Sequence, residues 1–158
     1  MGGQACVFYG AAQFSKDVDL VLLASEENFS RLREALHELD AKRIAVPPFN
    51  PDLLARGHAV HFRCHSGETN GLRVDVMTRL RDLPPFEQLW NRRTTLIGES
   101  GEVFEVMAVE DLVQAKKTQR DKDWPVIAAL LEGHYRSLGN EPTSERIAFW
   151  LSESRIAE

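Results

Sequence analysis

The sequence predicts an α/β protein of the α+β kind, with a mixed β-sheet flanked by helices and further helices at the C-terminal end. Short runs of apolar or alternating residues, which are typical of strands, occur among amphipathic runs with helical spacing. The segment HSGETNG is rich in turn-forming residues and predicts a hairpin between two of the strands. A chain of 158 residues that is 43% hydrophobic is long enough to bury the core of one such domain.

The first half of the chain predicts two helices and two strands. Residues 4–14 mix small, apolar and polar side chains in a way that suits one short helix, and strand 17–24 follows with the apolar run VLLA. Ser25 is a residue type that caps helices, so we expect helix 26–39 to begin after it. The apolar stripe of that helix comprises Phe29, Leu32, Leu36 and Leu39. Strand 42–46 is expected next.

The second half predicts a hairpin, a second hairpin and four helices. After a loop over residues 47–57, strands 58–64 and 72–78 form the first hairpin. A short helix, FEQLWNRR, follows the proline pair Pro84-Pro85, and TTLIGESGEVFEVM predicts the second hairpin. The last helices are expected over residues 109–119, 121–133 and 143–152.

Three aspartates on strands are the strongest indication of function. Asp17 and Asp19 are two residues apart on one predicted strand, so their carboxylates lie on the same face. In the strand RVDVM, Arg73, Asp75 and Met77 alternate with the valines, and the hairpin is expected to bring Asp75 beside the first strand. Carboxylates that converge in this way favour a bound cation such as Mg²⁺.

A glycine pair precedes these aspartates. Gly2 and Gly3 are separated from Asp17 by residues 4–16, at the start of the first predicted helix. Backbone N–H groups at a helix N-terminus favour an anion, and glycine allows that anion to come close to the main chain. A phosphate site followed by a carboxylate site contains the parts needed for metal-dependent phosphoryl transfer.

The arrangement of Gly2-Gly3, a spacer and Asp17-Val18-Asp19-Leu20 resembles the signature of the DNA polymerase beta-type nucleotidyltransferase superfamily. It is more narrowly similar to small bacterial nucleotidyltransferases of the abortive-infection, toxin–antitoxin and antibiotic-modifying kinds. The similarity continues through RVDVMTRL and FEQLW into VEDLVQAKKTQRDKDWPVIAALL. It implies a nucleotidyltransferase domain over residues 1–131, with 132–158 as its C-terminal helical tail.

The resemblance also implies a mechanism with two Mg²⁺ or Mn²⁺ ions and a nucleoside triphosphate (NTP) as substrate. Asp17 and Asp19 would ligate both metals, and Asp75 would ligate one and help to deprotonate the acceptor hydroxyl. Lys116 would contact the triphosphate, although the alternative that it belongs to a solvated helix face stays open. The basic segment that contains Lys116, Lys117, Arg120 and Lys122 is the expected contact surface for triphosphate or an RNA backbone.

Three functions from different classes follow from these residues. The first is an enzyme that transfers a nucleoside monophosphate (NMP) from an NTP to a hydroxyl of a tRNA end, a protein or a small-molecule drug. The second is a toxin with the same chemistry that a cognate antitoxin restrains. The third is a nucleotide-binding or interaction module without turnover. A zinc site at His58, His61, Cys64 and His65 is disfavoured, because positions 58, 61 and 64 of one strand cannot share a face.

Composition and the chain start add further expectations. The net charge is −5, and neither a long apolar run nor a leader-like segment is present, so we expect a cytoplasmic protein without membrane association. Cys6 and Cys64 lie in apolar contexts and suit reduced, packed thiols. Relatives in the resembling family have a strand before the glycine pair. Because Met1 directly precedes the motif, we expect either a misplaced start codon or a domain that lacks this strand.

Overall fold

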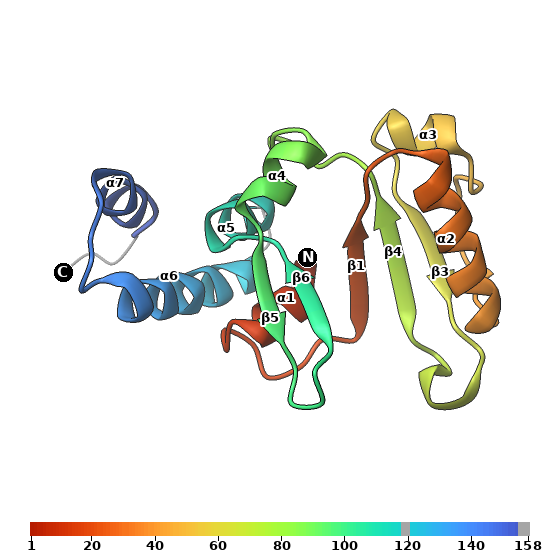
Figure 1. Ribbon diagram of the computed structural model, residues 1–158, viewed down its shortest axis with the longest axis horizontal. Helices are drawn as coiled ribbons and strands as arrows, with labels where there is room; N and C mark the ends of the chain where they lie inside the picture. Colours follow the sequence, from red (N-terminus) through yellow and green to blue (C-terminus); the bar gives the residue numbers. More distant parts are fainter. Residues whose placement is uncertain (118–120, 155–158) are drawn as a thin grey trace.

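A four-stranded mixed sheet forms the centre of the computed structural model, which describes residues 1–117 and 121–154 (Figure 1). Its strands lie in the order β1-β4-β3-β2. Strands β1 and β4 are parallel, whereas β3 pairs antiparallel with both β4 and β2. The strand bounds are Asp17–Val21 (β1), Lys42–Arg43 (β2), Val60–Arg63 (β3) and Arg73–Met77 (β4). The predicted α+β class with a mixed sheet is therefore confirmed, as is the hairpin of β3 and β4.

The valines of β4 define an apolar face of this sheet. They pack with helix α2 (Glu26–Glu38) and the short helix α3 (Pro51–Ala55) in one hydrophobic cluster. As predicted, Ser25 caps α2, where its Oγ accepts a hydrogen bond from the backbone N–H of Asn28 at 3.2 Å. Three residues of the predicted stripe are buried in this cluster: Phe29, Leu32 and Leu36.

A second hydrophobic cluster lies on the other side of β1. Figure 1 shows helices α1, α4, α5 and α6 grouped with the separate hairpin β5–β6 on that side, with α7 outermost. These elements have the following bounds: α1 Gly2–Phe8, α4 Phe86–Arg92, β5 Thr94–Ile97, β6 Val103–Val106, α5 Val109–Lys116, α6 Trp124–Leu138 and α7 Ser144–Glu153. Two 3₁₀ turns complete the described elements, η1 at Gly67–Thr69 and η2 at Asp121–Asp123.

The first helix is shorter than predicted. We expected residues 4–14, but α1 begins at Gly2 and ends at Phe8 because Gly10 adopts a left-handed conformation with φ 71°. The N–H groups of Gly10 and Ala11 donate to the carbonyls of Val7 and Cys6, at 2.9 and 2.8 Å. This pair of bonds is the Schellman motif, which ends helices at a glycine.

The first and second strands are also shorter than predicted. Strand β1 stops at Val21 rather than residue 24, because its partner β4 ends at Met77. Strand β2 stops at Arg43 rather than residue 46, although the Ile44 N–H still donates to the His61 carbonyl at 3.0 Å. Further on, Pro47 and Pro48 have no N–H to continue a ladder.

Helical structure also differs from prediction in three places. The predicted loop 47–57 contains α3, which Asn50 caps by accepting a hydrogen bond from the Asp52 N–H at 2.8 Å. Helix α5 ends at Lys116, and residues 118 and 119 of the predicted helix lie outside the described part of the chain. Helix α6 continues to Leu138 instead of residue 133, so the expected limit between domain and tail, at residues 131 and 132, falls inside a helix.

Cys6 and Cys64 are buried and unbonded to one another, as predicted. Within the described ranges, the helices are all too short or too polar to cross a membrane.

Candidate functional site

The three predicted aspartates lie on one face of the sheet. Asp19 of β1 is paired in register with Asp75 of β4, and Asp17 is paired with Arg73. Residues that face one another on adjacent strands point to the same side, and so do residues two apart on one strand. The side chains of Asp17, Asp19 and Asp75 therefore share the face opposite the apolar one that α2 covers, and this group is called the acidic face below.

Asp19 is held closely against the start of α1. The backbone N–H of Gly3 lies 3.4 Å from Asp19 Oδ2. Gly2 has φ 65°, and a Cβ added to it would lie only 1.8 Å from the same oxygen. Burial raises the pKa of Asp19, and the nearby charge of Asp75 raises it further, whereas the Gly3 N–H opposes both effects. The Asp19 carboxylate is thus a partly buried anion next to another anion, which is the environment that a cation stabilises.

Asp75 is only 8% exposed and already has cationic or polar neighbours. Its Oδ1 accepts a hydrogen bond from Arg73 Nε at 2.7 Å, and His61 Nδ1 lies 2.8 Å from the same oxygen. Arg73 Nη2 is also 3.1 Å from His61 Nδ1. The hydrogen bond to Asp75 raises the pKa of Arg73, and the charges of Asp17 and Asp19 contribute to this increase. Arg73 therefore neutralises part of the acidic face.

The acidic face has the ligand type of a divalent-cation site but not its arrangement. Carboxylate oxygens on neighbouring strands are the ligand type that Mg²⁺ prefers. However, within residues 1–117 and 121–154, no three or more His, Cys, Asp or Glu side chains are arranged so that they could hold a metal ion. Arg73 and His61 both contact Oδ1 of Asp75. A metal ion bound at this face would have to share Asp75 with these two side chains or displace them from that oxygen.

Lys116 points inward rather than into solvent. Only 16% of its side chain is exposed, and its Nζ lies 3.8 Å from the carboxylate of Asp123, which is itself buried. The positive charge of Lys116 also lowers the pKa of Asp19, against the larger effect of burial. The alternative of a solvated helix face is therefore wrong for Lys116, and the lysine lies on the β1 side of the acidic face. Its contact with a triphosphate stays a prediction.

The rest of the predicted basic segment is less available than the sequence indicates. Lys117 forms an ion pair with Glu153 of α7. Arg120 lies outside the described part of the chain, as does the side chain of Lys122.

Packing within the protein is enough to explain why residues 2 and 3 are glycines, without a bound ligand. Gly2 leaves room for the Asp19 carboxylate, and a Cβ on Gly3 would lie 2.3 Å from Ser15 Oγ. The phosphate cradle predicted at Gly2 and Gly3 stays a prediction.

Sequence reasoning missed the role of His61 and Arg73. The sequence indicates His61 only as a disfavoured zinc ligand, yet the structure pairs it in register with Asp75 across β3 and β4. The signal that could have found it is the hairpin itself. Once β3 and β4 are aligned, the face that contains Asp75 must also contain the residues opposite it.

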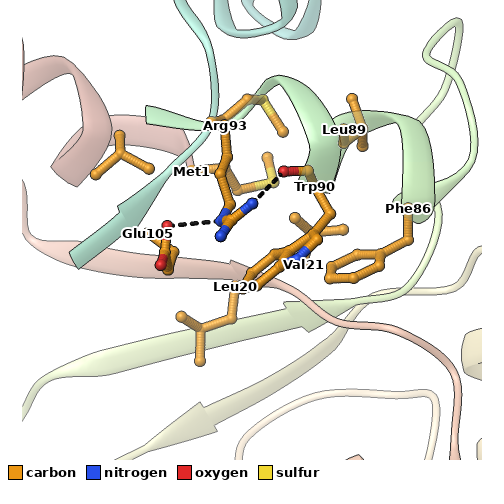
Figure 2. Close-up of a pocket in the computed structure, with 10 residues that line it drawn as sticks. Met1, Leu20, Val21, Phe86, Leu89, Trp90, Arg93 and Glu105 are labelled. Carbon is orange, nitrogen blue, oxygen red and sulfur yellow. Dashed lines mark hydrogen bonds and ion pairs between the residues drawn. The ribbon is translucent and has the colours of Figure 1, made fainter. Parts of the chain in front are cut away.

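A small cavity adjoins the acidic face at the end of β1. It has a volume of about 90 Å³ and lies between β1, α4 and β6 (Figure 2). The Arg93 guanidinium lies over the Trp90 ring at 3.9 Å and pairs with Glu105 at 2.7 Å, while Phe86 stacks on Trp90 with centroids 5.7 Å apart. Pockets for drug-sized ligands occupy about 300–1,000 Å³, so this cavity is too small for a nucleotide.

A larger apolar cavity of about 820 Å³ lies between α6 and α7. Its lining includes Trp124, Leu131, Tyr135, Trp150 and Leu151. None of the predicted site residues lines it.

Comparison with known proteins adds no identity to this description. No protein-family model matches the chain, and no curated protein matches it in sequence. The fold and the site together define the class: an α+β protein with a mixed sheet whose polar face has two in-register aspartates on parallel strands and a third on the same face.

Proposed function

We propose that this protein is a metal-dependent nucleotidyltransferase that moves NMP from an NTP to a hydroxyl acceptor. The observation that carries the proposal is the alignment of Asp19 with Asp75 on parallel strands, with Asp17 two residues away on the same face. The close packing of Gly2 and Gly3 around the first strand agrees with it. The resemblance of the Gly2-Gly3 and Asp17-Asp19 motif to DNA polymerase beta-type nucleotidyltransferases supplies the reaction class.

In this proposal each residue has a role that follows from its position at the acidic face. Asp17 and Asp19, with Asp75, would hold Mg²⁺ or Mn²⁺, which supplies charge stabilisation for the triphosphate and lowers the pKa of the acceptor hydroxyl. Asp75 would accept the proton of the acceptor hydroxyl as its oxygen attacks the α-phosphate, the bond between the α- and β-phosphates breaks, and pyrophosphate leaves. Lys116 lies on the β1 side, where it would stabilise the charge of the triphosphate and of the departing pyrophosphate. Arg73, which contacts Oδ1 of Asp75, would pair with a substrate phosphate if the metal displaces it from that oxygen.

Transfer of label from α-³²P NTPs tests the proposal. The purified protein is incubated with a tRNA and small-molecule extract in Mg²⁺ or in EDTA. We expect metal-dependent labelling that is lost in the Asp17→Asn/Asp19→Asn variant. Asp82→Asn is the control for loss of a carboxylate elsewhere, because Asp82 is exposed and lies outside the acidic face. Labelling that survives in the double variant would refute the assigned site.

One observation favours a second candidate, a nucleotide-binding module without turnover. Arg73 and His61 already contact Oδ1 of Asp75, so this carboxylate has partners within the protein in the absence of a metal. Such a module would bind Mn²⁺-NTP, seen as thermal stabilisation of the folded chain, but would transfer no label to any acceptor. A toxin that a cognate antitoxin restrains would use the transferase chemistry, and stays a prediction.

A further inference from the structure

Three cations form a row across the sheet, on the same face as the aspartates. Arg73 of β4 is paired in register with Asp17 on one side and with Arg63 of β3 on the other. Arg63 is in turn paired with Lys42 of β2. The order across the sheet is therefore Asp17, Arg73, Arg63, Lys42. Because neighbouring strands are about 4.8 Å apart, Arg73, Arg63 and Lys42, here called the cation row, span roughly 10 Å of this face.

Within the cation row, the juxtaposition of Arg63 and Lys42 is electrostatically unfavourable in the protein alone. Like charges directly opposite one another on adjacent strands destabilise a sheet. Arg73 has Asp75 as a partner, and Lys42 has only a long, exposed contact of 3.6 Å with Asp40. Arg63 donates to the Gly71 carbonyl at 3.1 Å, and no carboxylate of the described residues is within ion-pair distance of it. A polyanion laid along the row would remove this repulsion.

We propose that the cation row binds the phosphate backbone of a single-stranded RNA that serves as the hydroxyl acceptor. Arginine and lysine side chains of this length reach successive phosphates, and arginine binds them bidentately. The chain as a whole has a net charge of −5, so such binding would be confined to this local surface. An RNA end offers both a 2′ and a 3′ hydroxyl to Asp75.

The position of the cation row places the RNA acceptor and the NTP donor on different sides of the acidic face. This inference rests on the proposed function. Gly2, Gly3 and Lys116 lie on the β1 side of the acidic face, where the triphosphate is proposed to bind. Arg63 and Lys42 lie on the opposite side, beyond β4. Asp75 is between the two, where an acceptor hydroxyl would have to arrive.

Fluorescence anisotropy of a labelled, mixed-sequence single-stranded RNA tests the row, in EDTA and without NTP, over a series of salt concentrations. The variant is Lys42→Gln/Arg63→Gln. Arg31→Gln/Arg136→Gln is matched in charge and removes two exposed helix cations elsewhere. Each lost phosphate contact should reduce the slope of log K against log salt by about 0.7, so we expect a reduction of about 1.4 in the first variant and none in the second.

Several results would overturn the proposal. They are equal loss of binding in both double variants, no loss in either, no RNA binding by the wild type at low salt, and equal binding of polyglutamate, which has negative charges but no phosphates. Lys42→Arg/Arg63→Lys keeps the charges and should retain binding, which separates charge from folding. Since this binding needs neither metal nor NTP, Asp17→Asn/Asp19→Asn should still bind RNA. A failure of the label-transfer test would therefore leave the binding result unaffected.

Discussion

Gly2 determines how closely the main chain can approach the Asp19 carboxylate. Its φ of 65° is unfavourable for any residue with a side chain, and an added Cβ would meet Asp19 Oδ2 at 1.8 Å. Gly10 also has a positive φ, of 71°, but nothing lies within 4 Å of an added Cβ there. Comparing the two glycines therefore separates two costs of adding a side chain: backbone strain, which both positions share, and a steric clash with Asp19, which only residue 2 would meet.

We predict that Gly2→Ala lowers the free energy of unfolding by at least about 2 kcal/mol, because it adds displacement of Asp19 to left-handed strain. Gly10→Ala should cost only the strain, about 1 kcal/mol. Urea denaturation of both variants and the wild type measures these differences. Equal losses in the two variants would show that the Asp19 carboxylate does not restrict residue 2.

The aspartates could be predicted from the sequence, whereas the partners of Asp75 could not. Spacing of two residues fixes Asp17 and Asp19 on one face whatever the strand pairs with. The contacts of Asp75 depend instead on the register of β3 against β4, which the turn between them sets. A one-residue shift would have placed His61 on the opposite face, and the sequence alone does not exclude that shift.

At the scale of elements, the errors of prediction occur where a single turn or capping residue decides. Alternation and amphipathic spacing located the strands β1 and β4 and the helix α2. The end of α1 depends on the left-handed conformation of Gly10, and α3 depends on Asn50 followed by Pro51 at the first helical position. Such signals span two residues and are easily outweighed by the polar composition around them.

The contact of α7 with α6 depends on a histidine. Trp150 Nε1 donates to His134 Nδ1 at 3.0 Å, and Glu110 of α5 lies 3.5 Å from His134 Nε2. Phe149 packs edge-on against the same ring. Burial lowers the pKa of His134, and the charge of Arg146 lowers it further, against the opposing effect of Glu110. A protonated Nδ1 could not accept the Trp150 hydrogen bond.

We predict that α7 separates from α6 in mild acid. Because the docked state has the lower His134 pKa, the undocked state binds the proton first, so docking loses stability as the pH falls below about 6.5. Hydrogen exchange of the α7 amides between about pH 5 and pH 7.5, corrected for intrinsic exchange, measures this loss. His134→Gln should abolish the pH dependence, whereas His37→Gln, at an exposed position of α2, should retain it. Persistence of the pH response in His134→Gln would assign it to another group.

At the scale of the whole molecule, β1 joins two hydrophobic clusters. Val18 and Leu20 of this strand pack with the cluster of α2, α3 and the sheet, and Val21 packs with the cluster of α1, α4, α5 and α6. The acidic face lies on the same strand, so its geometry depends on both clusters.

Leu54 and Leu112 test whether the two clusters unfold together. Both side chains are fully buried, Leu54 of α3 in the first cluster and Leu112 of α5 in the second. Each change to alanine should cost about 2–5 kcal/mol. All three tryptophans, Trp90, Trp124 and Trp150, belong to α4, α6 and α7 on the second side of β1, so their fluorescence reports that side, whereas far-UV circular dichroism reports the whole chain.

Since β1 is shared, we predict that Leu54→Ala shifts the tryptophan transition in urea as far as the circular dichroism transition. The two should coincide within error for Leu112→Ala as well, as expected for one cooperative unit. A fluorescence midpoint that stays at the wild-type value in Leu54→Ala, while circular dichroism becomes biphasic, would show that β1 does not couple the clusters. In that case the sheet could unfold while α1 and Lys116 keep their fold, and the acidic face would be lost without loss of the helical side.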